Sequence, residues 1–205
     1  MQNCDLFLTS ELSLTGYPPQ DLLLRKDFLK KVEIFKKKII NLTKKKKTIF
    51  ALSIPLSKIN EITNALLLVQ SGKIIYSVQK KILPNYGVFD EKRYFSSTQI
   101  KTKYFNYRNK KIEFLICEDM WTNDFIEKKK EKLDLIVVIN ASPFEIGKFK
   151  LRQRHASKRA KHFRSNLVYV NLVGSQDDLI FDGGSFVMDK LGEIVIQEKF
   201  FEESE

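Results

Sequence analysis

The apolar residues of this chain occur in short runs, and this feature limits its fold more than any other. The longest runs are Ala-Leu-Leu-Leu-Val at 65–69 and Leu-Ile-Val-Val-Ile at 135–139. Runs of this length fit buried β-strands, whereas a membrane-spanning helix needs about 20 consecutive apolar residues. The sequence therefore excludes a membrane span and predicts a protein built around several short buried strands.

Segments with helical periodicity alternate with these runs. After Asp27, apolar residues recur at spacings of three and four from Phe28 to Leu42, which predicts an amphipathic helix with lysines on its outer face. A basic helix is expected at about 148–164 and a short one at about 124–132. This alternation of helices and strands predicts an α/β fold with a mixed sheet.

The expected strands are bounded by turn residues. Ser71-Gly72 joins two strands as a hairpin, and a second hairpin is expected around Arg108-Asn109. Antiparallel strands are expected in the tail, around Asp182-Gly-Gly184. The full set of expected strands is 6–10, 48–54, 62–69, 73–78, 112–116, 135–139, 167–172, 179–189 and 193–197.

Length and composition indicate a globular protein of one domain, covering residues 1–205. The 205 residues fall close to the usual size of one domain, and 43% of them are hydrophobic, including 16 Phe. Such a chain has enough apolar material for a core, which excludes a wholly disordered protein.

The strong positive charge raises the question of nucleic-acid binding. The net charge is +11, but it comes from 29 Lys and only 7 Arg, and the lysine runs interrupt helix-like segments. Base-edge and bidentate phosphate recognition favour Arg. We therefore expect a solvated lysine-rich surface and no nucleic-acid partner.

The N-terminus and the cysteines bear on the compartment. The first residues lack a basic segment and a long apolar segment, so no secretory signal peptide is expected and a cytoplasmic location is predicted. Cys4 and Cys117 are 113 positions apart and cannot form the dense disulfide framework of a small secreted domain. Both are expected to be thiols.

Three chemically reactive residues, Glu11, Lys80 and Cys117, follow three different expected strands. A thiol is nucleophilic as the thiolate, so it needs a base and a cationic neighbour, which the other two residues could supply. Simpler roles remain open: the cysteine as a small buried apolar residue, the glutamate as a turn cap, and the lysine as one of many surface lysines. His155 and His162 offer an alternative Cys–His pairing.

Five stretches, in the same order along the chain, carry a resemblance to a known family. The chain resembles the glutaminase domain of glutamine-dependent NAD+ synthetases, within the nitrilase (carbon–nitrogen hydrolase) superfamily. The resemblance implies an α-β-β-α sandwich that pairs into a homo-oligomer. The stretches are 11–23, 80–91, 117–121, 140–144 and 181–185.

The resemblance also implies roles for the three reactive residues. Glu11 would be the general base, Lys80 the lysine that stabilises an oxyanion, and Cys117 the nucleophile. Lys80 is preferred to Lys81 because the family lysine lies three positions before the leucine of the Leu-Pro-Asn-Tyr motif, which is Leu83 here.

Six further residues match family positions near the substrate. Tyr17 resembles an aromatic residue that covers the pocket and Glu91 a second carboxylate near the lysine, with loop packing and a surface charge as their alternatives. Glu118, next to the cysteine, is expected to face the substrate. The positions that match glutamine-binding residues are Tyr86, Ser142 and Lys148.

The chain departs from the family pattern at both ends. Met1 stands only ten positions before Glu11, so a first strand–helix unit is expected to be missing, and the Ser-Gly-Gly-x-Asp-Ser loop of the synthetase domain does not occur. The resemblance implies no metal or cofactor for this part, since ATP and Mg would belong to the synthetase domain.

The resemblance makes L-glutamine and a synthetase domain, in cis or in trans, the expected partners. A stand-alone nitrilase-type amidase acting on another small amide, or a catalytically inactive fragment, are the alternative functions.

Overall fold

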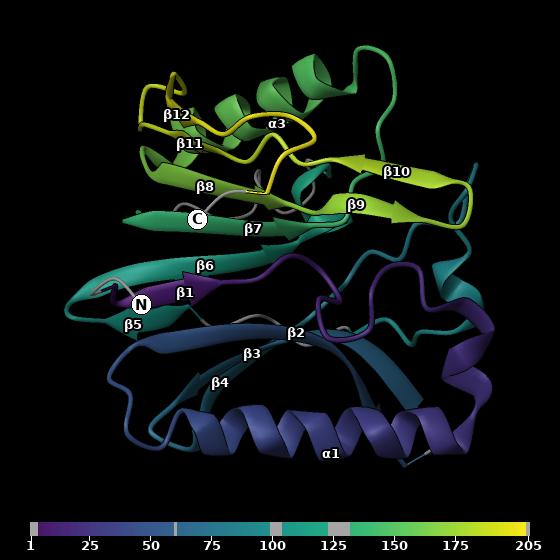
Figure 1. Ribbon diagram of the computed structural model, residues 1–205. Coiled ribbons are helices and arrows are strands. Elements are labelled where there is room, and N and C mark those ends of the chain that lie inside the picture. The colour runs from purple at the N-terminus through teal and green to yellow at the C-terminus, as the bar shows by residue number, and fades with distance from the viewer. Residues whose placement is uncertain (1–3, 60, 99–103, 123–131, 204–205) are drawn as a thin grey trace. The chain divides into compact units, whose positions relative to one another are not determined.

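The computed structural model describes residues 4–59, 61–98, 104–122 and 132–203, so the short helix expected at about 124–132 lies almost wholly outside the described residues. The chain divides into two compact units, residues 1–100 and 101–205. Each unit is built around its own main sheet (Figure 1). Among the described residues, no helix is long and apolar enough to cross a bilayer.

The first unit contains a four-stranded sheet. Its strands are β1 (Leu6–Leu8), β2 (Ile49–Lys58), β3 (Glu61–Gln70) and β4 (Lys73–Gln79), and they lie in sequence order across the sheet. β1 pairs with β2 in parallel, and the other pairs are antiparallel. β1 and β4 therefore run in the same direction, and their carboxyl ends lie at the same edge of the sheet.

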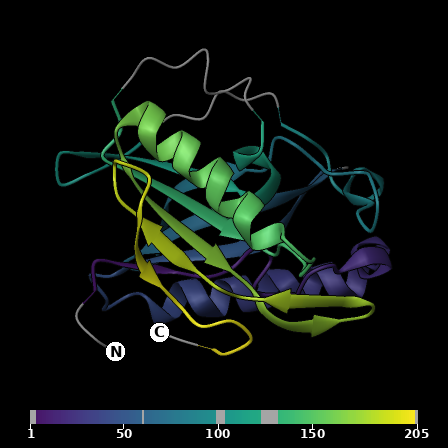
Figure 2. The same ribbon diagram turned by 90° about the horizontal axis from the view of Figure 1, so that it is seen from above.

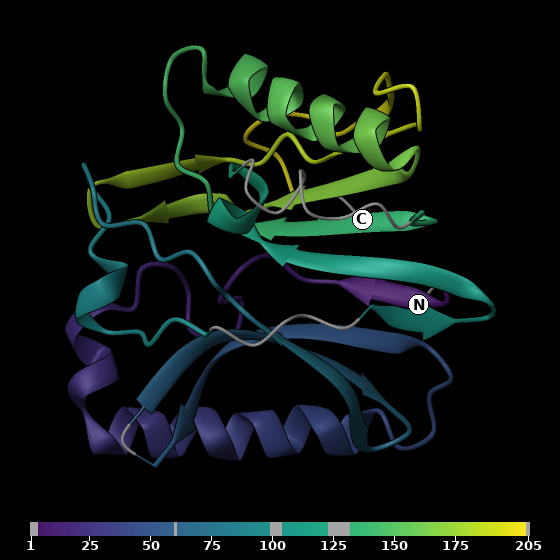
Figure 3. The same cartoon turned by 180° about the vertical axis from the view of Figure 1, so that it is seen from behind.

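One long helix, α1 (Lys26–Leu42), lies along one face of this sheet, as views from opposite sides show (Figures 1 and 3). Its Ile39 and Ile40 pack against the core cluster that includes Leu52 and Leu67. The helix begins slightly earlier than the sequence predicts. Asp27 was expected to cap it but lies in the first turn, where a carboxylate is favourable beside the positive end of the helix dipole.

The hairpin expected at Ser71-Gly72 is confirmed. Both residues have positive φ, 51° and 78°, as a two-residue type I′ turn requires. The Gly72 N–H donates to Thr43 Oγ1 at 3.0 Å. A Cβ at Gly72 would lie 2.7 Å from the Cγ of Lys44, so glycine is needed both for its conformation and for this close approach.

The second unit contains a six-stranded sheet in the order β12-β11-β8-β7-β6-β5. Its three central strands are parallel and the outer strands are antiparallel, which confirms the mixed sheet. The strands are β5 (Phe105–Tyr107), β6 (Lys110–Ile116), β7 (Leu135–Asn140), β8 (Asn166–Asn171), β11 (Phe186–Met188) and β12 (Ile194–Gln197).

The antiparallel strands expected in the tail around Asp182-Gly-Gly184 are confirmed, and the segment 179–189 is divided at the two glycines. Gly183 and Gly184 have φ of 60° and 62°, which an extended strand cannot contain, so the segment forms β10 (Leu179–Asp182) and β11. β10 pairs with β9 (Val173–Gln176), a strand that the sequence analysis did not predict.

The basic helix expected at about 148–164 is confirmed as α3 (Lys148–Phe163), which lies across the sheet of the second unit (Figure 2). Its buried face carries Ala156, Ala160 and Phe163, which pack against β8 residues such as Leu167 in the main core cluster of this unit. Arg164 ends the helix in the left-handed conformation, with φ of 49°.

Candidate active site

A buried ionic cluster lies at the edge of the first sheet where β1 and β4 end. The Nζ atom of Lys80 is 2.7 Å from Oε1 of Glu11 and 2.6 Å from Oε1 of Glu91. The three side chains are at most 5% exposed. Lys80 directly follows β4, and Glu11 comes three residues after β1, so the shared direction of these strands brings the two residues together.

Neutral donors hold the two carboxylates of this cluster in place. The Asn64 side-chain amide donates to Glu11 Oε1 at 2.7 Å, and the Tyr17 hydroxyl donates to Glu91 Oε1 at 2.7 Å. The backbone N–H of Lys80 donates to the Asn64 carbonyl at 2.8 Å. One oxygen of Glu11 therefore receives both an ammonium and an amide, which fixes the orientation of this carboxylate.

The cluster contains two carboxylates and one ammonium. Burial raises the pKa of Glu91 to about 7; the charge of Lys80 opposes this shift and the charge of Glu11 adds to it. Glu91 Oε2 accepts no hydrogen bond from the described residues. A group with this pKa exchanges its proton near neutral pH, so the cluster can store or release a proton.

These positions decide between some of the earlier interpretations. Glu91 is 4% exposed, at the start of η2 (Glu91–Arg93), so the interpretation as a surface charge is wrong. Tyr17 is 3% exposed and bonded to Glu91, which goes beyond loop packing. Tyr86 is 55% exposed, with its ring edge against Phe89 at a centroid distance of 5.5 Å.

Cys117 lies in the second unit, directly after β6, as the first residue of the short 3-10 turn η3 (Cys117–Met120). Its φ is 45°, a left-handed conformation that is uncommon for a residue other than glycine and that marks constrained, often functional, positions. The side chain is 6% exposed, and the neighbouring Glu118 is half-buried. The Ile116 N–H donates to the Asp119 carboxylate at 3.4 Å, which ties the turn to the end of the strand.

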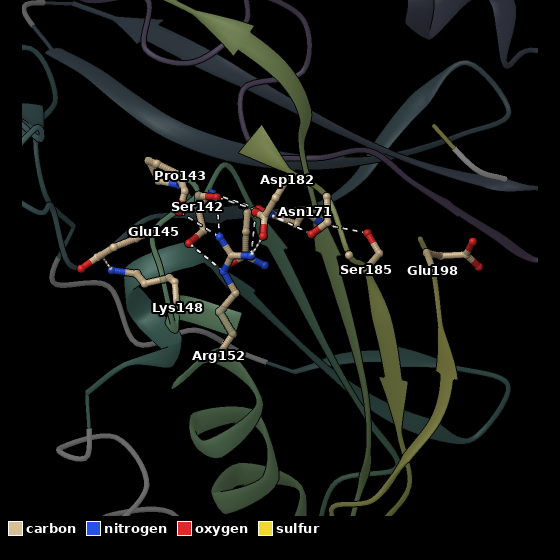
Figure 4. Close-up of polar contacts among 12 residues, drawn as sticks. Ser142, Pro143, Glu145, Lys148, Arg152, Asn171, Asp182, Ser185 and Glu198 are labelled. Atoms are coloured by element: carbon tan, nitrogen blue, oxygen red, sulfur yellow. Dashed lines mark hydrogen bonds and ion pairs between the residues drawn. The ribbon is translucent and has the colours of Figure 1, made fainter. Parts of the chain in front are cut away.

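A second buried polar network surrounds Arg152, on α3 (Figure 4). Its Nη1 atom donates to both oxygens of Asp182, at 2.8 and 2.9 Å. Its Nε atom donates to the hydroxyl of Ser142 at 3.1 Å, and Nη2 donates to the carbonyls of Ser142 and Pro143 at 2.8 and 2.9 Å. This arginine therefore fixes the loop that carries Ser142.

Asn171, at the end of β8, completes this network. Its side chain accepts from the Ser142 N–H at 2.9 Å and donates to the Gly183 carbonyl at 3.1 Å. Lys148, at the start of α3, forms an ion pair with Glu145 at 3.2 Å. The expected substrate residues Ser142 and Lys148 therefore occupy one loop and the helix that follows it.

Tyr169, on β8, is a fully buried tyrosine of the second unit. Its pKa is raised, chiefly by burial; the charge of Arg152 opposes the shift and that of Cys117 adds to it. Its hydroxyl has no hydrogen-bond partner among the described residues. Its ring stacks on Phe186, with centroids 4.7 Å apart.

The two histidines of the alternative pairing lie on α3. The His155 ring is 4.7 Å from the ring of Trp121, and burial lowers the pKa of His155 further than the nearby Arg159 charge does. His162 is exposed and lies against Phe163. The Cys–His pairing remains an untested alternative.

Several residues of the two clusters were not identified in the sequence. Arg152 and Arg159 share the helix face that carries Ala156, Ala160 and Phe163, so two cations at core positions were a readable signal. Among many lysines this signal is easily overlooked. The other residues missed are Asn64, Asn171 and Asp182, which have no comparable local signature.

The chain belongs to the carbon–nitrogen hydrolase family, whose model matches residues 1–204. It is 40% identical over 195 residues to the glutamine-dependent NAD(+) synthetase of Aquifex aeolicus, covering 94% of this chain and 34% of that protein. It is 37% identical over 204 residues to the protein of the same name from Thermotoga maritima, covering 97% of this chain and 35% of that protein. The chain spans about a third of the length of these curated relatives.

Solved structures confirm the nitrilase-like α/β fold. The glutamine-dependent NAD+ synthetase of Acinetobacter baumannii, in complex with ADP, matches with a TM-score of 0.87 and 37% identity, over 99% of this chain and 38% of that one. An amidase of the nitrilase superfamily from Nesterenkonia AN1 matches with a TM-score of 0.82 and 20% identity, over 97% of this chain and 74% of that one, which speaks for the fold alone.

Proposed function

We propose that this chain is a glutaminase that hydrolyses the side-chain amide of L-glutamine and supplies the ammonia to an NAD+ synthetase domain, in cis or in trans. The observation that carries the proposal is the buried Glu11–Lys80 pair, at 2.7 Å, in a chain of the carbon–nitrogen hydrolase family. The names of the relatives that match nearly all of this chain support the choice of glutamine.

In the proposed reaction, Cys117 is the nucleophile. Its sulfur attacks the amide carbon of glutamine while Glu11 accepts the thiol proton, and Lys80 stabilises the resulting oxyanion. The C–N bond then breaks, and Glu11 returns the proton to the departing ammonia. A water molecule, deprotonated by the same carboxylate, adds to the thioester and releases glutamate and the thiol.

The remaining expected residues would bind the substrate. By charge, Lys148 complements the α-carboxylate of glutamine and Glu118 its α-ammonium group. The hydroxyl groups of Tyr86 and Ser142 would add hydrogen bonds. Tyr17 would act through Glu91: its hydroxyl donates a hydrogen bond to that carboxylate, and this bond lowers the pKa of Glu91.

Ammonia release from glutamine and from other small amides tests this function. We expect glutamine to be preferred, Cys117→Ala to abolish release, and Cys4→Ala to change it little, because Cys4 is exposed and belongs to none of the five motif stretches. Preference for another amide would instead support the stand-alone amidase. If the Cys4 variant lost activity and the Cys117 variant did not, the assignment of Cys117 as the nucleophile would be wrong.

The coupling to synthesis has its own test. The isolated chain should make no NAD+ from deamido-NAD+, ATP and glutamine, and addition of a synthetase domain should raise its glutaminase activity. A folded chain that a glutamine-directed electrophile such as diazo-oxo-norleucine does not label would favour the inactive alternative. We also propose that the chain forms a homo-oligomer, which its molar mass in solution will decide.

A further inference from the structure

Arg159 makes three hydrogen bonds to the backbone of the turn that begins at Cys117. Its Nε atom donates to the Met120 carbonyl at 2.8 Å, and its Nη2 atom donates to the carbonyls of Asp119 and Thr122 at 2.6 and 3.0 Å. The arginine is 1% exposed, on the buried face of α3. All these atoms belong to the second unit.

The need for these bonds follows from the shape of the turn. A short helical turn leaves its last carbonyl groups without partners inside the turn, and buried carbonyls without partners destabilise the fold. Met120 and Asp119 are both buried, so solvent cannot serve these groups. Arg159 donates hydrogen bonds to the carbonyl groups of all three residues, 119, 120 and 122.

A guanidinium suits this task better than an ammonium. Its planar, fixed array of donors can meet several carbonyls at once, whereas an ammonium is a compact point charge on a flexible stem. Burial lowers the pKa of Arg159, and the charges of Glu113 and Asp119 oppose that shift. A guanidinium remains protonated in proteins, so it keeps all its donors.

The turn in question holds Cys117 in its left-handed conformation. A residue keeps such a conformation only where the surrounding structure fixes it from several sides. Here β6 fixes the turn from the strand, through the Ile116–Asp119 hydrogen bond, and Arg159 fixes its far end. We propose that Arg159 is a positioning residue for Cys117: through the carbonyls of this turn it aims the thiol, and thereby sets the rate of thiol chemistry. This inference rests on the proposed role of Cys117 as the nucleophile.

Two rates test the proposal, both in a Cys4→Ser background so that Cys117 is the single thiol. One is alkylation by iodoacetamide as a function of pH, and the other is ammonia release from glutamine, separated into kcat and KM. We expect Arg159→Met to lower kcat and the alkylation rate about 10- to 100-fold, since misplacement by about 1 Å can cost about 100-fold. KM should change less than about twofold, and Arg159→Lys should recover part of the loss.

Two control variants on the same helix separate positioning from stability. Arg154→Met removes an exposed arginine of α3 and should leave both rates unchanged. Phe163→Leu reduces the packing of the core cluster while leaving the hydrogen bonds from Arg159 to the turn in place, and it gives the rate loss expected from destabilisation alone. If Arg159→Met does not fold, Arg159→Lys is compared with Phe163→Leu at equal melting temperature.

The outcomes are distinct. Rates in the Arg159 variants equal to those of the parent, or lowered only as far as in Phe163→Leu, would overturn the proposal. If the parent chain releases no ammonia from glutamine, the proposed function fails, yet alkylation of Cys117 still decides the role of Arg159.

Discussion

The buried polar clusters of the two units differ in their charge balance. In the first unit, one ammonium faces two carboxylates, and an oxygen of Glu91 accepts no hydrogen bond from the described residues. In the second, one guanidinium faces one carboxylate, with two hydrogen bonds between Arg152 and Asp182 and three more from Arg152 to Ser142 and Pro143. In the first cluster, burial raises the pKa of Glu91 to about 7, whereas the second cluster pairs its one cation with one carboxylate.

This difference separates two tasks. Proton transfer needs a group whose pKa lies near the working pH, and the excess carboxylate of the first cluster provides one. Holding the loop that carries Ser142 in one position needs several donors in a fixed array, and the guanidinium of Arg152 provides them. Substitutions at Lys80, Arg152 and Glu91 test whether the separation holds, and a comparison at Cys117 follows them.

The largest effect is expected for Lys80→Met. It leaves Glu11 and Glu91 buried without their cation, so the free energy of unfolding at pH 8 should fall by about 3–5 kcal/mol, and ammonia release should be lost. At pH 5 much of the stability should return, because the carboxylates can take up protons. Urea unfolding at both pH values measures the free energy of unfolding. An unchanged value at pH 8 would contradict the claim that Lys80 compensates the charges of the two buried carboxylates.

Arg152→Met should cost about 3 kcal/mol, because it leaves Asp182 buried without its guanidinium. The double variant Arg152→Met with Asp182→Leu should be more stable than the single one, since it removes the buried charge as well. Urea unfolding of both variants measures the difference. Equal stability of the two would mean that the ion pair contributes little.

Glu91→Gln should remove a pH dependence of stability. The pKa of Glu91 in the folded protein, about 7, lies above its ordinary value of 4.5, so folding favours the protonated form. Its stabilising contribution is therefore complete below about pH 4.5 and is lost as pH rises towards 7, on the order of 3 kcal/mol. Thermal unfolding between pH 4 and 8 should show a steeper fall in the parent than in the variant; parallel curves would exclude the raised pKa.

The smallest effect compares Cys117→Gly with Cys117→Ala. Both lack the thiol, but glycine adopts a positive φ without the Cβ strain that alanine retains at 45°. We expect the glycine variant to be more stable by about 1 kcal/mol in urea unfolding. The reverse order would show that the left-handed backbone relaxes when the thiol is removed.

The sequence predicts which strands the reactive residues follow, but it does not predict which side chains they contact. Apolar periodicity shows where β4 and β6 end, and with them Lys80 and Cys117. The contact between Asn64 and Glu11 depends on how β1, β2 and β3 are arranged in the sheet, which no local pattern contains. Long-range partners were therefore missed even where the residues they hold were identified.

Two further misses have local causes. The sequence places antiparallel strands around Asp182-Gly-Gly184, but it gives no bounds for the separate strands β10 and β11. The buried positions of Arg152 and Arg159 on α3 were not identified, because the positive charge of the chain as a whole was interpreted as a solvated lysine-rich surface. In both cases the interpretation followed the composition of the segment or of the chain, whereas the structure depends on the positions of individual residues.

The left-handed backbone at Cys117 has a consequence for how such a chain changes under mutation. At this position, the exchange expected to relieve the backbone strain is to glycine, and it is also an exchange that removes the sulfur. Selection for thermal stability alone would therefore favour loss of the thiol at this position. Engineering guided only by stability would remove the proposed nucleophile. A cysteine retained at such a position is a sign that something other than folding maintains it.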